Sequence, residues 1–500
     1  MKIQIAQINS YCGQVKKNLD RHMEILQSAS PDSYTVFPYK SLCGFPLGSK
    51  VEYPSLLSDF ENIVSELDRA RKNYVVSLPY LAQGKISFFH HCSSDQTETP
   101  NRNNKGMCLL QQEPQCIVAG LLGELSSIDI PAGTHIHVAL LFDDKPFHVE
   151  KSIQCDEVVH SFITTFRPDC TLLIRRTGGE GGLIFEGNSK VYNRKGELCA
   201  EAPRFEESTL VIDTEHLSPI TPQKPDRIAM MHEAIVSGIR DYFKKNGIQK
   251  AFLGLSGGID SALVVVLAVE ALGKENVKGI LMPSAVSSDH SITDAEKSAQ
   301  NLGIRYHIIP IEPIFQRISL SLHPLFQGLP TDLTEENIQA RVRGIILMAI
   351  SNKFGGALLN TSNKSESAVG YGTLYGDMCG GLAPIADVYK TDVWAMARYI
   401  NRRQEIIPWN SINKVPSAEL RPGQKDSDSL PDYDLLDKVL YDYLENCLSE
   451  QELLAKGYDA ELIHRIVHLI RINEWKRRQA PPPIKTARRT FGREILFPIA

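Results

Sequence analysis

Short apolar runs separated by polar turns dominate the first 215 residues. The runs are rich in β-branched and aromatic side chains, which is typical of strands. They cover 2–8, 34–39, 74–80, 135–142, 170–176, 182–187, 189–193 and 208–214. Only two segments, about 17–29 and 55–72, have a helical pattern. Many strands with few helices predict a sandwich of sheets with helices outside.

The pattern changes after a proline-rich stretch, HLSPITPQKPD, at 216–226. This stretch is the predicted linker between an N-terminal domain, 1–215, and a C-terminal domain, 227–500. In the second domain strands alternate with helices, which predicts a doubly wound parallel sheet. The expected strands are 250–256, 277–283, 305–311 and 356–361, and the expected helices are 227–247, one from Ser261, 294–301 and 334–355. We expect Thr334 to cap the last of these helices.

Composition excludes some classes of protein. The chain has 500 residues, 42% of them hydrophobic, and its 54 basic and 59 acidic side chains give a net charge of -5. This charge offers no overall attraction for nucleic acid or an anionic membrane. No apolar run approaches the roughly 18 residues that span a bilayer. We therefore expect a cytoplasmic protein, and its 10 cysteines are expected to be reduced and mostly buried.

A glycine-rich loop, GLSGGIDS, connects an apolar strand to a long apolar helix. Free N–H groups at the helix start and the helix dipole together favour an anion there. The spacing fits neither of the two common nucleotide loops, GxxxxGK[ST] and GxGxxG. An acid beside phosphates is repulsive unless a divalent cation lies between them, so the loop's Asp260 indicates a metal.

SGGIDS resembles the pyrophosphate loop of enzymes that split ATP between its α- and β-phosphates. Downstream, LNTSNKSESAVGYGTLYGDMCGG, DVYKTDV, VPSAELRPGQKDSDSLPDYDLLDKVL and EWKRRQAPPPIKTARRTFGREILFPIA resemble, in order, the synthetase domain of the NAD synthetase family. The resemblance covers about residues 225–500.

The resemblance implies roles for individual residues. ATP would be bound by Gly254, Leu255, Ser256, Gly257, Gly258, Ile259, Asp260, Ser261, Arg341, Thr361, Lys390 and Ser417. Deamido-NAD would be bound by Asn337, Glu366, Asp377 and Lys476. Asp260 and Glu366 would hold Mg²⁺, and Asp260, Glu366 and Lys390 would be the catalytic set.

The implied reaction forms an amide. The nicotinate carboxylate of deamido-NAD attacks the α-phosphorus of ATP, and ammonia then displaces AMP to give NAD. Such chemistry needs positioning and charge neutralisation but no covalent enzyme intermediate. A related acceptor, nicotinate mononucleotide, stays possible.

Residues 1–215 resemble the nitrilase-type amidase domain of glutamine-dependent NAD synthetases, on IAQINSYCGQVKKNLD, YTVFPYKSLCGFP and GLIFEGNSKVYNRKGELCAEAPRFEESTLVIDTE. Such domains release ammonia with a Glu, Lys, Cys triad. Here Tyr39 stands at the Glu position, Phe142 at the Cys position, and no Lys occurs in 115–125. We therefore expect a pseudo-glutaminase, an inactive domain in a homo-oligomer (a dimer or larger), and ammonia as the direct nitrogen donor.

Other interpretations stay open. Glutamine could supply nitrogen through a partner glutaminase or an unconventional one that uses Cys43 or Cys155, although the acids that follow Cys155 are the reverse of the electropositive surroundings that a thiolate needs. The chain could also be a regulatory or binding homologue that has lost catalysis. A fourth possibility is a relative that thiolates a tRNA base, which the charge disfavours and Cys379 keeps open.

Overall fold

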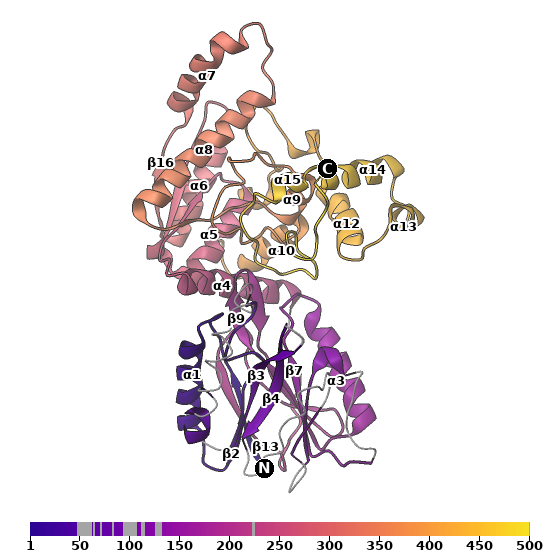
Figure 1. Cartoon of the computed structure of the whole chain (residues 1–500). Coiled ribbons are helices and arrows are strands. Elements are labelled where there is room, and N and C mark those ends of the chain that lie inside the picture. The colour runs from indigo at the N-terminus through magenta and orange to yellow at the C-terminus, as the bar shows by residue number, and fades with distance from the viewer. Residues whose placement is uncertain are drawn as a thin grey trace. The chain divides into compact units, whose positions relative to one another are not determined.

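The computed structural model of the chain has two compact units, Met1–Lys224 and Pro225–Ala500 (Figure 1). It describes residues 1–47, 63, 66–70, 73–82, 85–93, 108–111, 116–125, 133–222 and 226–499. The helix predicted for 55–72 lies mostly outside these residues. Within the described ranges, no helix has the length and apolar character needed to cross a membrane.

The first unit contains two large sheets and a hairpin. One sheet has the order β13-β1-β2-β3-β4, formed by Ser208–Asp213, Lys2–Gln7, Ser33–Val36, Tyr74–Ala82 and Lys85–Ser93. The other has the order β12-β11-β8-β7-β6-β5, formed by Leu198–Glu201, Lys190–Asn193, Cys170–Arg175, Val138–Asp143, Ile117–Leu121 and Cys108–Gln111. The hairpin pairs β9, Thr177–Glu180, with β10, Leu183–Glu186.

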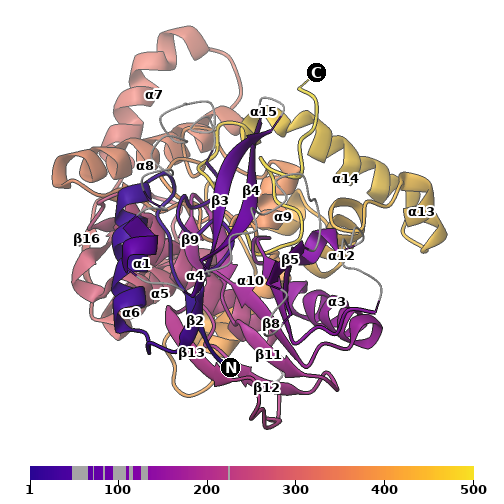
Figure 2. The ribbon, with the colours of Figure 1, turned by 60° about the horizontal axis from the view of Figure 1, so that its bottom comes forward.

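Three apolar layers hold this unit together. Inward side chains of both sheets, such as Ile5 and Leu140, share one buried cluster. Helix α1 (Val15–Ser28) packs on the outer face of the first sheet through Leu26, and α3 (Lys151–Phe166) covers the second sheet through Val159 and Phe162. The result is the predicted α-β-β-α sandwich, with α1 and α3 on opposite sides of the strands (Figure 2).

The second unit is built on a parallel sheet of order β16-β15-β14-β17, as predicted. Its strands are Arg305–Ile308, Val277–Leu281, Ala251–Gly254 and Ala357–Leu358. Its longer helices are α4 (Arg227–Lys245), α5 (Ile259–Leu272), α6 (Asp289–Leu302), α7 (Glu312–Phe326), α8 (Leu333–Phe354), α10 (Lys390–Ile400), α12 (Tyr433–Leu444) and α14 (Ala460–Ile472). The shorter ones are α9 (Lys364–Val369), α11 (Trp409–Asn413), α13 (Glu450–Ala455) and α15 (Glu474–Arg477).

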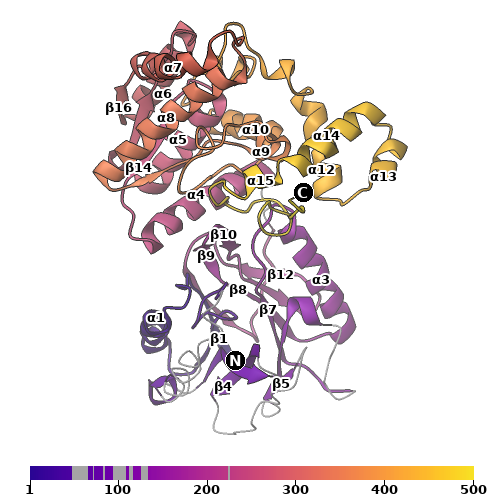
Figure 3. The same ribbon diagram turned by 45° about the horizontal axis from the view of Figure 1, so that its top comes forward.

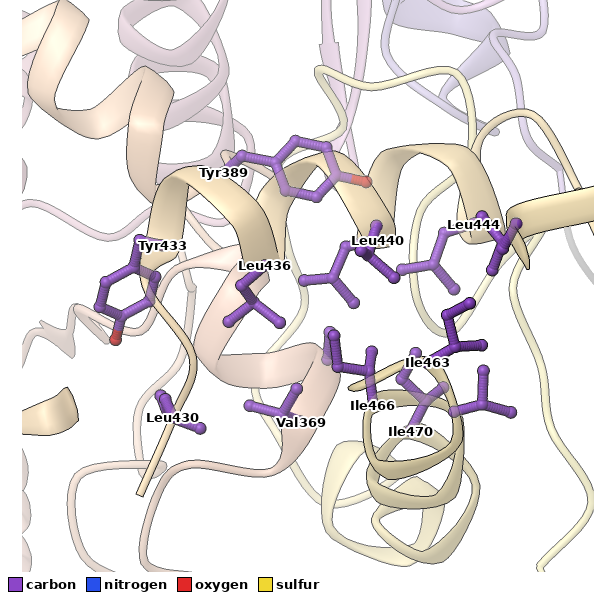
Figure 4. Packing of buried hydrophobic residues seen from close by; sticks show 14 of the residues in the cluster. Val369, Tyr389, Leu430, Tyr433, Leu436, Leu440, Leu444, Ile463, Ile466 and Ile470 are labelled. Carbon is purple, nitrogen blue, oxygen red and sulfur yellow. The ribbon is translucent and has the colours of Figure 1, made fainter. Parts of the chain in front are cut away.

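A second apolar core lies beside this sheet, where α12 packs against α14 and α9. Leu436 and Leu440 of α12 meet Ile466 and Ile470 of α14, all fully buried, with Val369 at the end of α9 (Figure 4). Figure 3 shows α9 and α10 enclosed between the helices over the sheet and this second core. The core thus fixes α9 from the side away from the sheet.

Several local features differ from the sequence predictions, two helices and one helix cap among them. Helices α3 and α7 were not predicted, because their β-branched and aromatic residues favour strands when taken one by one. The cap of α8 is Asp332, not Thr334: the Asp332 carboxylate accepts the Thr334 N–H at 2.7 Å and Glu335 completes a capping box. An acid two residues earlier therefore fills the role that we gave to Thr334.

We expect Leu436→Ala to lower the free energy of unfolding by about 2–5 kcal/mol, since it leaves a cavity in a fully packed core. Leu435→Ala, on the same helix but 40% exposed, is the matched control and should cost less than about 1 kcal/mol. Chemical denaturation measures both. Equal losses would contradict the assigned packing of α12.

The buried His22 makes a pH prediction. Its ring bonds to Asn18 O and Ser41 Oγ, and burial lowers its pKa from 6.5 to about 4. As pH falls, the unfolded chain therefore protonates His22 before the folded protein does. The stability that neutral His22 contributes is present above about pH 6.5 and is lost as pH falls toward 4. The loss is about 3 kcal/mol. Denaturation at several pH values should show a shallower pH dependence in His22→Gln, whereas His307→Gln, at an exposed histidine of β16, should keep the wild-type dependence.

Candidate active site

The glycine loop lies between β14 and α5. Gly258 is the N-cap of α5, and its N–H donates to Ser256 Oγ at 3.2 Å. Ser261 Oγ donates to Gly258 O at 3.0 Å. These bonds curl the loop around the start of α5, where backbone N–H groups and the helix dipole favour an anion.

Gly257 is required by its surroundings. Its φ of +75° is left-handed, and a Cβ there would lie 2.1 Å from Ser291 O. Ser411 Oγ also donates to Gly257 O at 2.9 Å. A side chain would force the loop away from the start of α6, so this glycine keeps the anion site in place.

Three charged side chains meet beside this loop. Lys390 Nζ lies 2.5 Å from Asp260 Oδ2 and 3.4 Å from Glu366 Oε1. Asp260 is in the first turn of α5, which follows β14, and Glu366 is in the first turn of α9, which follows β17. The two strands are parallel neighbours, so their carboxyl ends bring the two acids to one edge of the sheet.

The charges of this cluster depend on one another. Burial and the charge of Asp260 raise the pKa of Glu366 to about 8, although Lys390 opposes them. Burial alone would lower the pKa of Lys390, but the two carboxylates outweigh it and raise that pKa. Two acids kept this close require a cation between them, and Lys390 supplies it in this structure.

Asn363, which we did not predict, orders the two acids. Its Nδ2 donates to Asp260 Oδ1 at 3.0 Å, and its Oδ1 accepts the N–H of Glu366 at 2.9 Å. Asn363 is fully buried and is the N-cap of α9. The Asn-x-x-Glu spacing could have indicated the cap, but the bond to Asp260 depends on the fold.

A third acid also went unpredicted. Asp426 is buried and accepts the hydroxyls of Tyr371 and Tyr433 at 3.1 and 3.0 Å. The ring of Tyr433 lies 5.4 Å from Lys390 Nζ. Burial raises the pKa of Asp426, and these phenols form one side of the charged cluster.

Among the described residues, Arg341, Thr361 and Ser417 are not bonded to this cluster. Arg341 Nε on α8 donates to Leu374 O at 3.3 Å, Thr361 follows β17, and Ser417 Oγ donates to Gln424 O at 2.6 Å. Within the described part of the chain, no hydrogen bond joins any of the three to the charged cluster. Their assignment to ATP stays a prediction.

Asn337, Asp377 and Lys476 gather around residues 370–377. Thr373 Oγ1 donates to Asn337 Oδ1 at 2.8 Å and its N–H to Asp377 Oδ1 at 2.7 Å. Lys476 Nζ donates to the carbonyls of Gly370 and Gly372, both at 3.0 Å. The structure therefore brings three predicted dinucleotide residues to one segment, and their role stays a prediction.

The amidase-like positions of the first unit lie in its core. Tyr39 and Phe142 belong to the same buried cluster between the two sheets. Next to Phe142, Asp143 pairs with Lys151 at 2.8 Å and Arg175 at 3.0 Å. A buried ion-pair network follows the position where the resemblance places a nucleophile.

The two alternative thiols are poor nucleophiles in this structure. Burial raises the pKa of Cys43 to about 12, and burial also raises that of Cys155. A thiolate, not a thiol, attacks an amide. His160, five residues after Cys155, bonds instead to the carbonyls of Asp156 and Gly196.

Comparisons with known proteins agree with the two-unit fold. The sequence model of NAD synthase matches residues 231–480. A glutamine-dependent NAD(+) synthetase of Acinetobacter baylyi is 34% identical over 531 aligned residues, covering 100% of this chain and 98% of that protein. One from Synechocystis sp. is 50% identical over 335 residues, which are 66% of this chain but only 60% of that protein.

Two solved structures are similar along the whole chain. A glutamine-dependent NAD+ synthetase from Acinetobacter baumannii, in complex with ADP, has a TM-score of 0.75 at 30% identity and covers 100% of this chain and 98% of its own. One from Cytophaga hutchinsonii has a TM-score of 0.84 at 18% identity with the same coverage; at that identity it supports the fold alone. The predicted two-domain α/β class is confirmed.

We expect Lys390→Met to lower the free energy of unfolding by about 3 kcal/mol without divalent cations, since two largely buried acids, with side chains 18% and 16% exposed, lose their partner. Saturating Mg²⁺ should recover more stability in the variant than it adds to the wild type. Lys414→Met is the control, because the Lys414 side chain is 24% exposed and its ammonium lies 4.0 Å from Glu419. Thermal unfolding with and without Mg²⁺ measures both; an equal Mg²⁺ effect in all three proteins would contradict the assigned cluster.

Proposed function

Because the chain belongs to the NAD synthase family, we propose that it converts deamido-NAD to NAD, cleaving ATP to AMP and pyrophosphate, with glutamine as the source of nitrogen. The observation that carries this proposal is the juxtaposition of the glycine loop with Asp260, Glu366 and Lys390. An anion site beside two acids and a lysine is suited to a polyphosphate held with a divalent cation.

A magnesium ion fits the residues present. Asp260 and Glu366 offer hard carboxylate oxygens, which Mg²⁺ prefers. Both face a position where this structure already places a cationic nitrogen. The raised pKa of Glu366 means that its buried negative charge is unfavourable unless a cation lies nearby. When bound, Mg²⁺ neutralises phosphate charge and so favours attack at phosphorus.

In the first step the glycine loop holds the phosphates of ATP at the N-terminus of α5. A nicotinate carboxylate oxygen attacks the α-phosphorus, the bond to the bridging oxygen breaks, and pyrophosphate leaves. Lys390 now donates to Asp260. With ATP bound, its ammonium would donate to phosphate oxygens, and it would stay beside Asp260 and Glu366. Its charge is maintained there because its pKa is raised by the acids.

In the second step ammonia attacks the carbonyl carbon of the adenylate. The bond to the AMP oxygen breaks and AMP leaves, the attacking nitrogen loses one proton to water, and the amide of NAD remains. Asn337, Asp377 and Lys476, which lie around residues 370–377, are proposed to position the dinucleotide. Glu366 would contact both this substrate and the cation.

The relatives support glutamine as the proposed nitrogen source, and they correct a prediction. Those named above are glutamine-dependent, which contradicts our expectation of a pseudo-glutaminase and leans against ammonia as the preferred donor. Tyr39 and Phe142 exclude only the usual triad at those two positions. Either an unconventional nucleophile or a partner glutaminase would release the ammonia.

A homo-oligomer is also proposed. Large apolar side chains are exposed on and near α7 and α8, which favours contact with another protein surface. They are Leu320, Leu325, Leu329, Leu333 and Ile345.

The purified chain should form NAD from deamido-NAD, ATP and Mg²⁺ when an ammonium salt supplies nitrogen, as measured by chromatography of the products. Asp260→Asn should lower this rate by at least about a hundredfold, since it removes a carboxylate that clamps the metal. Ammonia-free glutamine distinguishes the two routes: NAD with glutamine alone assigns a nucleophile to this chain, and NAD with ammonium alone assigns glutamine hydrolysis to a partner. Absence of NAD with either donor would contradict the proposal.

A further inference from the structure

We propose that Asp437 is a positioning residue for this reaction: its carboxylate, together with Ser365, holds the starts of α9 and α10 so that Glu366 and Lys390 face Asp260. Only the predicted changes in kcat and KM rest on the proposed function. Asp437 lies on α12 and is not among the residues to which the resemblance gave a role.

Helix α10 begins without a cap of its own. Tyr389 occupies its N-cap and makes no side-chain bond to it, although the first N–H groups of any helix need acceptors. Here two other helices supply them. The N–H of Lys390 donates to Ser365 Oγ at 2.9 Å, and the N–H of Thr391 donates to Asp437 Oδ2 at 2.8 Å.

The same carboxylate binds the helix that carries Glu366. Ser365 Oγ donates to Asp437 Oδ1 at 2.5 Å, so both oxygens of Asp437 are occupied, one by α9 and one by α10. Ser365 is fully buried and Asp437 is 5% exposed. One anion therefore sets the spacing between the residue before Glu366 and the residue after Lys390.

Helix α12 holds α9 at a second point. Glu445, which ends α12, pairs with Lys364 Nζ at 2.6 Å, and Asp387 pairs with the same nitrogen at 2.9 Å. The two residues preceding Glu366 are thus both fixed by α12. A side chain whose backbone is held this way has little freedom to leave the productive geometry.

A purely structural role is the competing explanation, and α12 offers a matched control for it. Asp442 is 6% exposed, like Asp437. It is also fully bonded, to Lys456 at 2.8 Å and Tyr458 at 2.9 Å. These partners follow α13, Glu450–Ala455, and among the described residues no side-chain hydrogen bond or ion pair joins them to α9 or α10. Removing Asp442 should therefore cost stability without moving Glu366 or Lys390.

The test compares the full-length wild type with Asp437→Ala, Asp437→Asn and Asp442→Ala. We expect Asp437→Ala to lower kcat about 10- to 100-fold, as misplacement by a fraction of an ångström does, with KM for deamido-NAD changed less than about threefold. Asp437→Asn should recover most of kcat, because its amide can still accept from Thr391 and bond to Ser365. Asp442→Ala should lose stability but keep kcat within about twofold.

Calorimetric titration with Mg²⁺-ATP supplies a readout that does not need turnover. Asp437→Ala should bind it about tenfold more weakly than the wild type and Asp442→Ala, so this arm stays informative even if the wild type forms no NAD and the proposed function fails. Wild-type kcat and affinity in folded Asp437→Ala would overturn the inference. If that variant does not fold, Ser365→Ala, which removes one hydroxyl, takes its place: a kcat within twofold of the wild type would overturn it equally.

Discussion

The ion pairs between Lys390 and the carboxylates of Asp260 and Glu366 are the interaction on which the rest of the second unit depends. Two partly buried acids at one sheet edge repel each other, and only a cation between them offsets this repulsion. The fold places a lysine there, and a divalent cation with a polyphosphate would take over the same task. On the proposed function, the cluster would exchange one cation for another.

The scaffold around this cluster is unusually polar for a buried region. Successive residues of α9 are bound by different partners: Lys364 by Asp387 and Glu445, Ser365 by Asp437, and Glu366 by Asn363 and Lys390. Each bond costs desolvation that the mutual pairing offsets. Such a fully paired network fixes orientation more sharply than apolar packing would, and the apolar core between α12 and α14 supports it from behind.

Sequence reasoning predicted the parts of the site that depend on residues close together in the chain. The glycine loop, its strand and its helix follow from residues close together in the chain, and so does the parallel sheet. The same reasoning did not predict the roles of Asn363 and Asp437, because their partners lie 103 and 72 residues away in the chain. Helix α3 was missed for another reason. Its Val, Ile, Phe and Thr residues favour strands on intrinsic preference, and only packing on the sheet makes the helix the stable structure. The nitrogen source could not be predicted from two substituted positions, since these show only what Tyr39 and Phe142 cannot do.

The central claim is that the cluster activates a carboxylate as an adenylate. The most direct measurement uses deamido-NAD labelled with ¹⁸O in the nicotinate carboxylate, followed by mass spectrometry of the products. Attack on the α-phosphorus predicts one ¹⁸O atom in each AMP and none in pyrophosphate. AMP without ¹⁸O, formed together with NAD, would contradict the account, because the carboxylate oxygen would then have left by another route.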